Sequence, residues 1–134
     1  MNPDPLTYLD ASDRLLGGSS RAAGPAMGGS ARGCAWLLRI ALECAIDEYW
    51  RQANPPVEGC RSRRAQFLLL RRYVGAVTAR RVRCAWTELS RAGHHHCFDL
   101  APSAGQLAAL TQEVASLVST LATATGPSEQ RSTT

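Results

Sequence analysis

Residues 34–53, CAWLLRIALECAIDEYWRQA, constrain the fold most because they are apolar almost throughout. The polar exceptions recur every four residues and so share one narrow stripe of a helix: Arg39, Glu43, Asp47 and Arg51. A helix with so little polar surface is buried on several sides, either at the centre of a bundle or against a second subunit. The apolar surface between Trp36 and Trp50 exceeds one face of a small monomer, so we predict a homodimer.

Helical patterns also occur on both sides of this segment. A short helix is expected from about Leu6 to Leu16, and the sequence NPP at positions 54–56 ends the apolar helix. Two more helices are expected, one from Cys60 and one over residues 78–93, with Gly75 permitting a bend between them. The second of these has one apolar face, which we expect to be buried: Val82, Ala85, Trp86 and Leu89.

The last predicted helix has the clearest signals. Ser103 and Gln106 have the spacing of a capping box, in which the two residues exchange hydrogen bonds at a helix N-terminus. Apolar residues then recur in heptad-like steps: Leu107, Leu110, Val114, Leu117 and Leu121. No segment alternates between apolar and polar residues as a strand does. The sequence therefore predicts an all-α protein, a bundle of four to five helices.

The glycine-rich stretch GGSSRAAGPAMGGSARG, residues 17–33, predicts a loop between the first two helices. We therefore divide the chain into a short N-terminal helix with this loop (1–30), a helical bundle domain (31–124) and a disordered tail (125–134). With 134 residues the chain is long enough to bury a core without disulfides or a metal.

The charged residues are unusual because all fifteen basic residues are arginine and none is lysine. The formal net charge is +4, which permits an RNA or DNA partner without requiring one. A basic middle segment contains eight of the arginines: Arg61, Arg63, Arg64, Arg71, Arg72, Arg80, Arg81 and Arg83. They would bind the phosphates of RNA as readily as those of DNA.

The five cysteines are odd in number and lack a regular metal-binding spacing, so we expect reduced thiols in the cytoplasm. The N-terminus has neither the basic region nor the apolar run of a signal peptide. The apolar run from Trp36 to Ile46 is interrupted by Arg39 and Glu43, so no membrane-spanning segment is expected.

The segment SRAGHHHCFDLAP, residues 90–102, contains three consecutive histidines. One hypothesis is a polar helix end, because cationic side chains near a helix C-terminus complement its dipole. A second is a metal site, with His94 and Cys97 as two ligands and Cys84 or Glu88 adding another. Adjacent histidines on an extended segment point in different directions, and no second pair of ligands occurs. We therefore predict no metal and no cofactor.

A third hypothesis follows from Arg91 and His96, which are spaced R-x4-H at a helix end before a capped final helix. In this respect the chain, chiefly residues 86–121, resembles the HEPN family of helical bundles, many of which are metal-independent RNA endonucleases with an R-x4-6-H motif. The resemblance implies that Arg91 and His96 are catalytic, in a site formed across a homodimer interface. His94, His95 and Arg83 would bind the substrate. A toxin–antitoxin or phage-defence setting is implied, with an antitoxin or other protein as a partner.

One departure from the motif favours the alternative of a catalytically inactive dimerisation or binding module. The residue after the motif arginine is commonly polar in active members of the family, whereas here it is Ala92. Gly93 follows it and lowers the rigidity of the helix next to the histidines.

Overall fold

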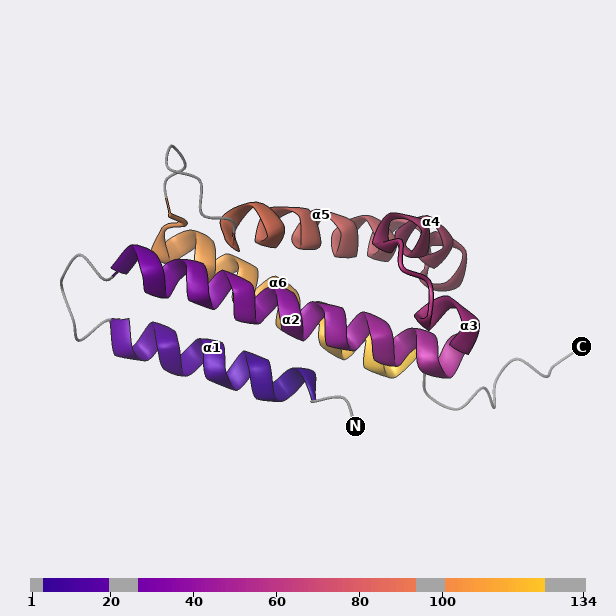
Figure 1. The fold of residues 1–134 in the computed structure, drawn as a ribbon, viewed down its shortest axis with the longest axis horizontal. Coiled ribbons are helices and arrows are strands. Elements are labelled where there is room, and N and C mark those ends of the chain that lie inside the picture. The colour runs from indigo at the N-terminus through magenta and orange to yellow at the C-terminus, as the bar shows by residue number, and fades with distance from the viewer. Residues whose placement is uncertain (1–3, 20–26, 94–100, 125–134) are drawn as a thin grey trace, which may run out of the picture.

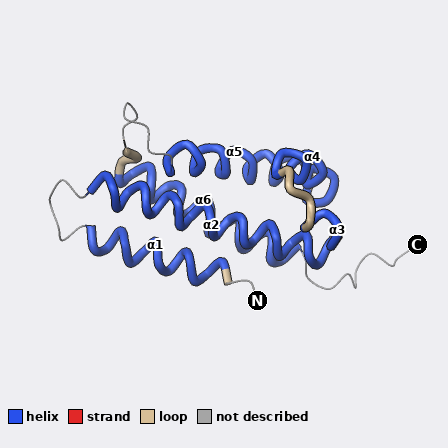
Figure 2. Tube along the Cα trace, in the orientation of Figure 1, coloured by secondary structure: helices blue, strands red, loops and turns tan. Residues whose placement is uncertain are grey.

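The computed structural model describes residues 4–19, 27–93 and 101–124. Within these ranges all regular secondary structure is helical (Figure 2), which confirms the predicted all-α class. The described helices are α1 (Pro5–Ser19), α2 (Met27–Ala53), α3 (Pro55–Glu58), α4 (Arg63–Val74), α5 (Ala76–Gly93) and α6 (Ala104–Ala124). Five of them correspond to the predicted helices, and α3 is an additional single turn after the NPP sequence.

The apolar helix α2 runs through the middle of the molecule, with α1 along one side, α4 and α5 along the other and α6 behind it (Figure 1). Its buried apolar side chains are Cys34, Ala35, Leu38, Ala41, Leu42, Ala45, Ile46, Tyr49 and Trp50. One chain is therefore enough to cover residues 31–53 of this helix, and among these residues, whose side chains the structure describes, Trp36 is the one large apolar side chain that is exposed. The homodimer remains a prediction, but the apolar surface of α2 does not require it.

Both ends of the predicted glycine-rich loop are helical. α1 continues to Ser19 and α2 already begins at Met27, and residues 20–26 between them are outside the described residues. The reason is packing, because Gly33 lies where α1 and α2 approach closely: a Cβ there would stand 3.1 Å from Leu15 Cδ2. Residues 5–19 thus pack onto the same core as the predicted bundle domain, and Leu9 is buried in it. The predicted tail, 125–134, is outside the described residues.

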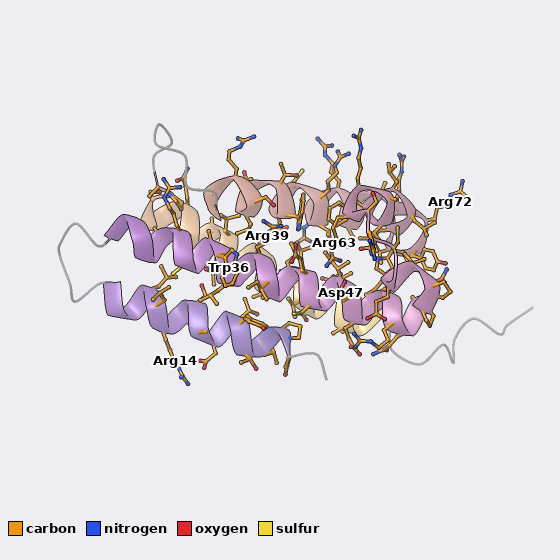
Figure 3. The ribbon with its side chains drawn as sticks, in the orientation of Figure 1. Arg14, Trp36, Arg39, Asp47, Arg63 and Arg72 are labelled. Carbon is orange, nitrogen blue, oxygen red and sulfur yellow. The ribbon has the colours of Figure 1, made fainter. Side chains whose placement is uncertain are left out.

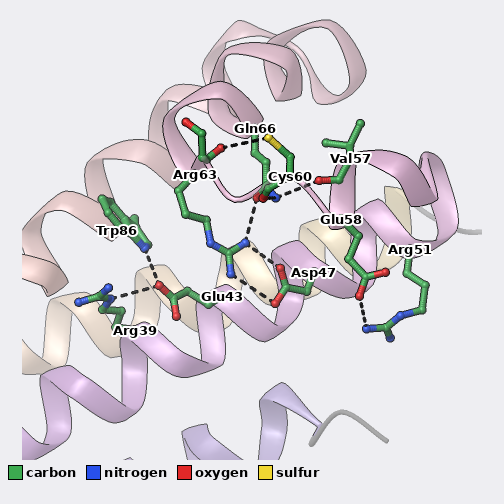
Figure 4. A network of polar contacts seen from close by, with 11 residues as sticks. Arg39, Glu43, Asp47, Arg51, Val57, Glu58, Cys60, Arg63, Gln66 and Trp86 are labelled. Carbon is green, nitrogen blue, oxygen red and sulfur yellow. Dashed lines mark hydrogen bonds and ion pairs between the residues drawn. The ribbon is translucent and has the colours of Figure 1, made fainter.

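The polar stripe of α2 faces α4 and α5, where it forms a network of hydrogen bonds and ion pairs (Figure 4). Asp47 pairs with Arg63 of α4 at 2.7 and 3.3 Å. Glu43 accepts hydrogen bonds from Arg39 and, at 3.0 Å, from the indole N–H of Trp86 on α5. Trp86 belongs to the predicted buried face of its helix, but its side chain is only half-buried, because it contacts Glu43 and Arg39 of this polar stripe.

Sequence signals at the helix ends are confirmed. Ser103 and Gln106 form the predicted capping box, with Ser103 N–H donating to Gln106 Oε1 at 2.8 Å and Gln106 N–H donating to Ser103 Oγ at 3.1 Å. Gly75 ends α4 with a φ of 91° and a ψ of 162°, a conformation that turns the chain directly into α5. At the other end of α4, Ser62 is the N-cap and accepts a hydrogen bond from Ala65 N–H.

Among the described helices α6 alone is long and apolar enough to cross a membrane by length and composition. Core helices of soluble proteins meet the same criteria, and α6 buries four of the five predicted apolar residues, Leu107, Val114, Leu117 and Leu121. The fifth, Leu110, is half-buried. This packing is compatible with a soluble protein.

Candidate nucleic-acid interface

Positive charge is segregated onto α4 and α5. Between Glu58 and Glu88 the sequence has eight arginines and no acidic residue, whereas the other seven arginines share the rest of the chain with eleven acidic residues. Because α4 and α5 are consecutive helices joined at Gly75, this segment covers one side of the molecule (Figure 1). The basic middle segment of the sequence thus lies on two neighbouring helices and the turn before the first of them.

Two of these eight arginines have structural partners. Arg63 pairs with Asp47, as described above, and Arg81 donates to both carboxylate oxygens of Glu113 on α6, at 2.8 and 3.2 Å. The hydrogen bond that Arg81 donates to Glu113 raises the pKa of the Arg81 guanidinium. These two side chains therefore tie α4 to α2 and α5 to α6.

The remaining six guanidinium groups are exposed and, among the described residues, form no ion pair or hydrogen bond. They belong to Arg61, Arg64, Arg71, Arg72, Arg80 and Arg83, and we call them the arginine face. Figure 3 shows Arg72 extending into solvent from α4, while Arg14, which pairs with Asp10, points away on the far side of α1. The planar guanidinium group of an unpaired arginine can donate two parallel N–H hydrogen bonds to the oxygens of one phosphate.

Part of the arginine face borders a groove of about 430 Å³ between α4 and α5. Each helix contributes two arginines, Arg64 and Arg71 from α4 and Arg80 and Arg83 from α5. The other lining residues are apolar: Phe67, Leu68, Ala76 and Ala79. The sequence places these arginines in one basic segment but does not show the groove, because only the sharp turn at Gly75 brings the two helices together.

A second groove, between α5 and α6, contains the candidate catalytic arginine. Arg91 is exposed in the last turn of α5 and lines this groove together with Glu88, Gln106 and Pro102. Arg83, predicted to bind substrate, is also exposed on α5, eight residues earlier or about 12 Å along the helix axis. His94, His95 and His96 lie outside the described residues, so the spacing of His96 from Arg91 stays a prediction.

Two of the four candidate metal ligands lie in the described part of the chain. Cys84 and Glu88 lie one turn apart on α5 and are exposed. Within the described part of the chain no three side chains of histidine, cysteine, aspartate or glutamate lie close enough to hold an ion. His94 and Cys97, the other two candidate ligands, are outside it.

No protein-family model, curated protein or solved structure matches this chain. The resemblance to the HEPN family therefore rests on the sequence motif.

Proposed function

We propose that this protein is a HEPN-like RNA-binding protein that cleaves RNA without a metal. The observation that carries the RNA-binding proposal is the arginine face, six exposed guanidinium groups without a carboxylate partner among the described residues. Structural arginines in the same helices, Arg63 and Arg81, are paired. Unpaired positive charges that lie on one surface repel each other, and a polyanionic ligand relieves this repulsion.

The proposed cleavage uses Arg91 and His96. His96 would take the proton of an RNA 2′-hydroxyl, a role for which imidazole is suited, and that oxygen would attack the adjacent phosphorus. Arg91 would stabilise the charge on the phosphate oxygens, and the bond to the 5′-oxygen would break as that oxygen takes a proton back from the protonated His96 or from water and leaves as a hydroxyl. The products are a 2′,3′-cyclic phosphate and a 5′-hydroxyl end. His94, His95 and Arg83 would hold neighbouring phosphates.

We further propose that the protein acts in the cytoplasm as a homodimer, in a toxin–antitoxin or phage-defence setting in which another protein restrains it. Support comes from the HEPN resemblance, in which motif residues of two subunits face each other. Exposed Arg91 is compatible with such an arrangement. Light scattering at micromolar concentration should give the mass of a dimer, and a monomeric mass would exclude a shared site.

Cleavage is tested by incubating the purified protein with a mixed RNA pool, with and without EDTA. Wild-type protein should cut in EDTA, and Arg91→Ala or His96→Ala should lower the rate by about two to four orders of magnitude. Arg14→Ala is the matched control, since Arg14 is exposed on α1 and paired with Asp10. Cleavage that needs a metal, or that survives both substitutions, would refute the assignment.

A second candidate function is RNA binding without cleavage. Ala92 and Gly93, which follow the motif arginine, are half-buried in the last turn of α5 and supply no polar side chain to the groove. Protein that binds RNA but leaves the whole pool intact would favour this function.

A further inference from the structure

We infer that the groove between α4 and α5 is a separate binding site for unpaired RNA, in which arginines hold phosphates and the apolar floor receives the faces of the bases. The inference rests on the proposed RNA binding and adds a substrate class and a location. This site is distinct from the groove that contains Arg91.

The positive charges of the groove face a shared space. Two arginines stand on α4 and two on α5, all four are exposed, and none is paired within the described residues. With a volume of about 430 Å³ the groove is within the range of sites that hold a nucleotide-sized ligand. A strand of phosphates entering it would meet guanidinium groups on both sides.

The floor of the groove indicates which form of RNA fits. Phe67 and Ala79 form its buried base, and Leu68 is exposed to 68%. In a duplex the faces of the bases are stacked on each other, so an apolar floor gains nothing. An unpaired base, in contrast, can lie on aliphatic side chains and against the planes of arginine guanidinium groups.

The groove should not select cytosine or adenine. Among the described side chains that line it, the polar ones are all arginines, which donate hydrogen bonds but accept none. Reading the amino group of cytosine or adenine requires an acceptor, whereas arginine can donate to acceptors on a base edge, such as O6 and N7 of guanine. Stacking and phosphate contacts are tolerant of sequence, so guanine is a base that these arginines can favour.

The shape favours a strand over a flat anionic surface. A membrane also offers phosphates, but the four arginines lie on the two walls of a groove, which a flat surface does not enter. The position of Arg80 adds to this, because it borders both this groove and the one with Arg91. Eleven residues, or about 16 Å of helix, separate Arg80 from Arg91, so one strand could cross α5 and occupy both grooves.

The test measures binding by fluorescence anisotropy, using a labelled 2′-O-methyl uridine oligonucleotide and a 2′-O-methyl RNA duplex with the same number of phosphates, because RNA without a free 2′-hydroxyl cannot be cut by the proposed mechanism. Wild-type protein should bind the single strand more tightly. The double variant Arg64→Ala/Arg71→Ala should weaken single-strand binding about tenfold or more. Leu68→Ser removes apolar floor and no charge, so it should weaken the single strand several-fold and leave the duplex unchanged. Arg14→Ala is the control, and circular dichroism checks that every variant is folded.

Three outcomes would overturn the inference. If wild-type protein binds the single strand but the groove variants bind equally well, the groove is not the site, while the proposed RNA binding stands. If the duplex binds as tightly and responds equally to Leu68→Ser, unpaired bases are not recognised. If neither RNA binds, but the protein binds vesicles of anionic lipid and the Arg64→Ala/Arg71→Ala variant does not, the ligand is a membrane surface and the proposed function fails too.

Discussion

Gln66 is a buried polar side chain, 2% exposed, and it connects the turn after α3 to α4. Its amide N–H group donates to the backbone carbonyls of Val57 at 3.0 Å and Cys60 at 2.9 Å, and its Oε1 accepts from Arg63 (Figure 4). Removing this amide breaks three hydrogen bonds of a buried side chain at once, which is more costly than losing one exposed hydrogen bond.

We expect Gln66→Leu to lower the free energy of unfolding by about 1–3 kcal/mol. The matched control is Gln52→Leu, because Gln52 is exposed and bonds only to Glu48 in the same helix, so its change should stay within about 0.5 kcal/mol. Urea denaturation followed by circular dichroism measures both. Equal effects would mean that the amide of Gln66 is not structurally important.

The thiols should differ strongly in reactivity. Cys34 is fully buried between α1 and α2, and burial raises the pKa of its thiol, whereas Cys84 is exposed on α5. Since the thiolate is the reactive form, a raised pKa means that less thiolate is present near neutral pH. A variant that keeps only Cys34 should react with a thiol reagent about a hundredfold or more slowly than one that keeps only Cys84, because labelling also needs opening of the core.

The rate for Cys34 should rise only at pH values above those at which a free cysteine thiol ionises, because burial raises the pKa of this thiol, and it should rise sharply when denaturant unfolds the protein. Equal labelling rates in native buffer would show that α1 does not cover Cys34.

At the level of helices, Gly75 determines how α4 turns into α5. Its φ of 91° and ψ of 162° lie in a region that only glycine occupies readily, and no atom lies within 4 Å of where a Cβ would be. Gly75→Ala should therefore cost about 1–3 kcal/mol through backbone strain alone.

Thermal and urea unfolding measure this effect, and Gly17→Ala is the control. Gly17 is inside α1, also with nothing within 4 Å, so alanine there should be neutral or slightly stabilising. A Gly75→Ala variant as stable as wild type would contradict the turn geometry.

Helix positions could largely be predicted from the sequence because their signals are local. Apolar periodicity located α2 and α6, and the Ser103–Gln106 spacing located the start of α6 within one residue. The start of α2 was missed because glycine is a poor helix former. At Gly33 the small side chain instead allows close packing on Leu15, which is a tertiary effect that no local pattern shows.

For the whole molecule, the sequence indicated a basic segment but not which of its arginines are paired within the fold and which are free. Eight arginines look equivalent in the sequence, and the fold pairs Arg63 and Arg81 with carboxylates from distant segments. The six that remain form the arginine face, and four of them border one groove. The apolar character of α2, which suggested a second subunit, is accounted for by α1, α5 and α6 of the same chain.

The salt dependence of RNA binding tests the arginine face most directly. Each neutralised phosphate of a single strand contributes about −0.7 to the slope of log K against log salt concentration, so four to six contacts predict a slope between about −3 and −4. Replacing one arginine of the face, such as Arg83, with alanine should make the slope less negative by about 0.7, and Arg14→Ala should leave it unchanged. A slope near zero, or one that the Arg83 variant shares with wild type, would contradict the proposal that these arginines bind RNA phosphates.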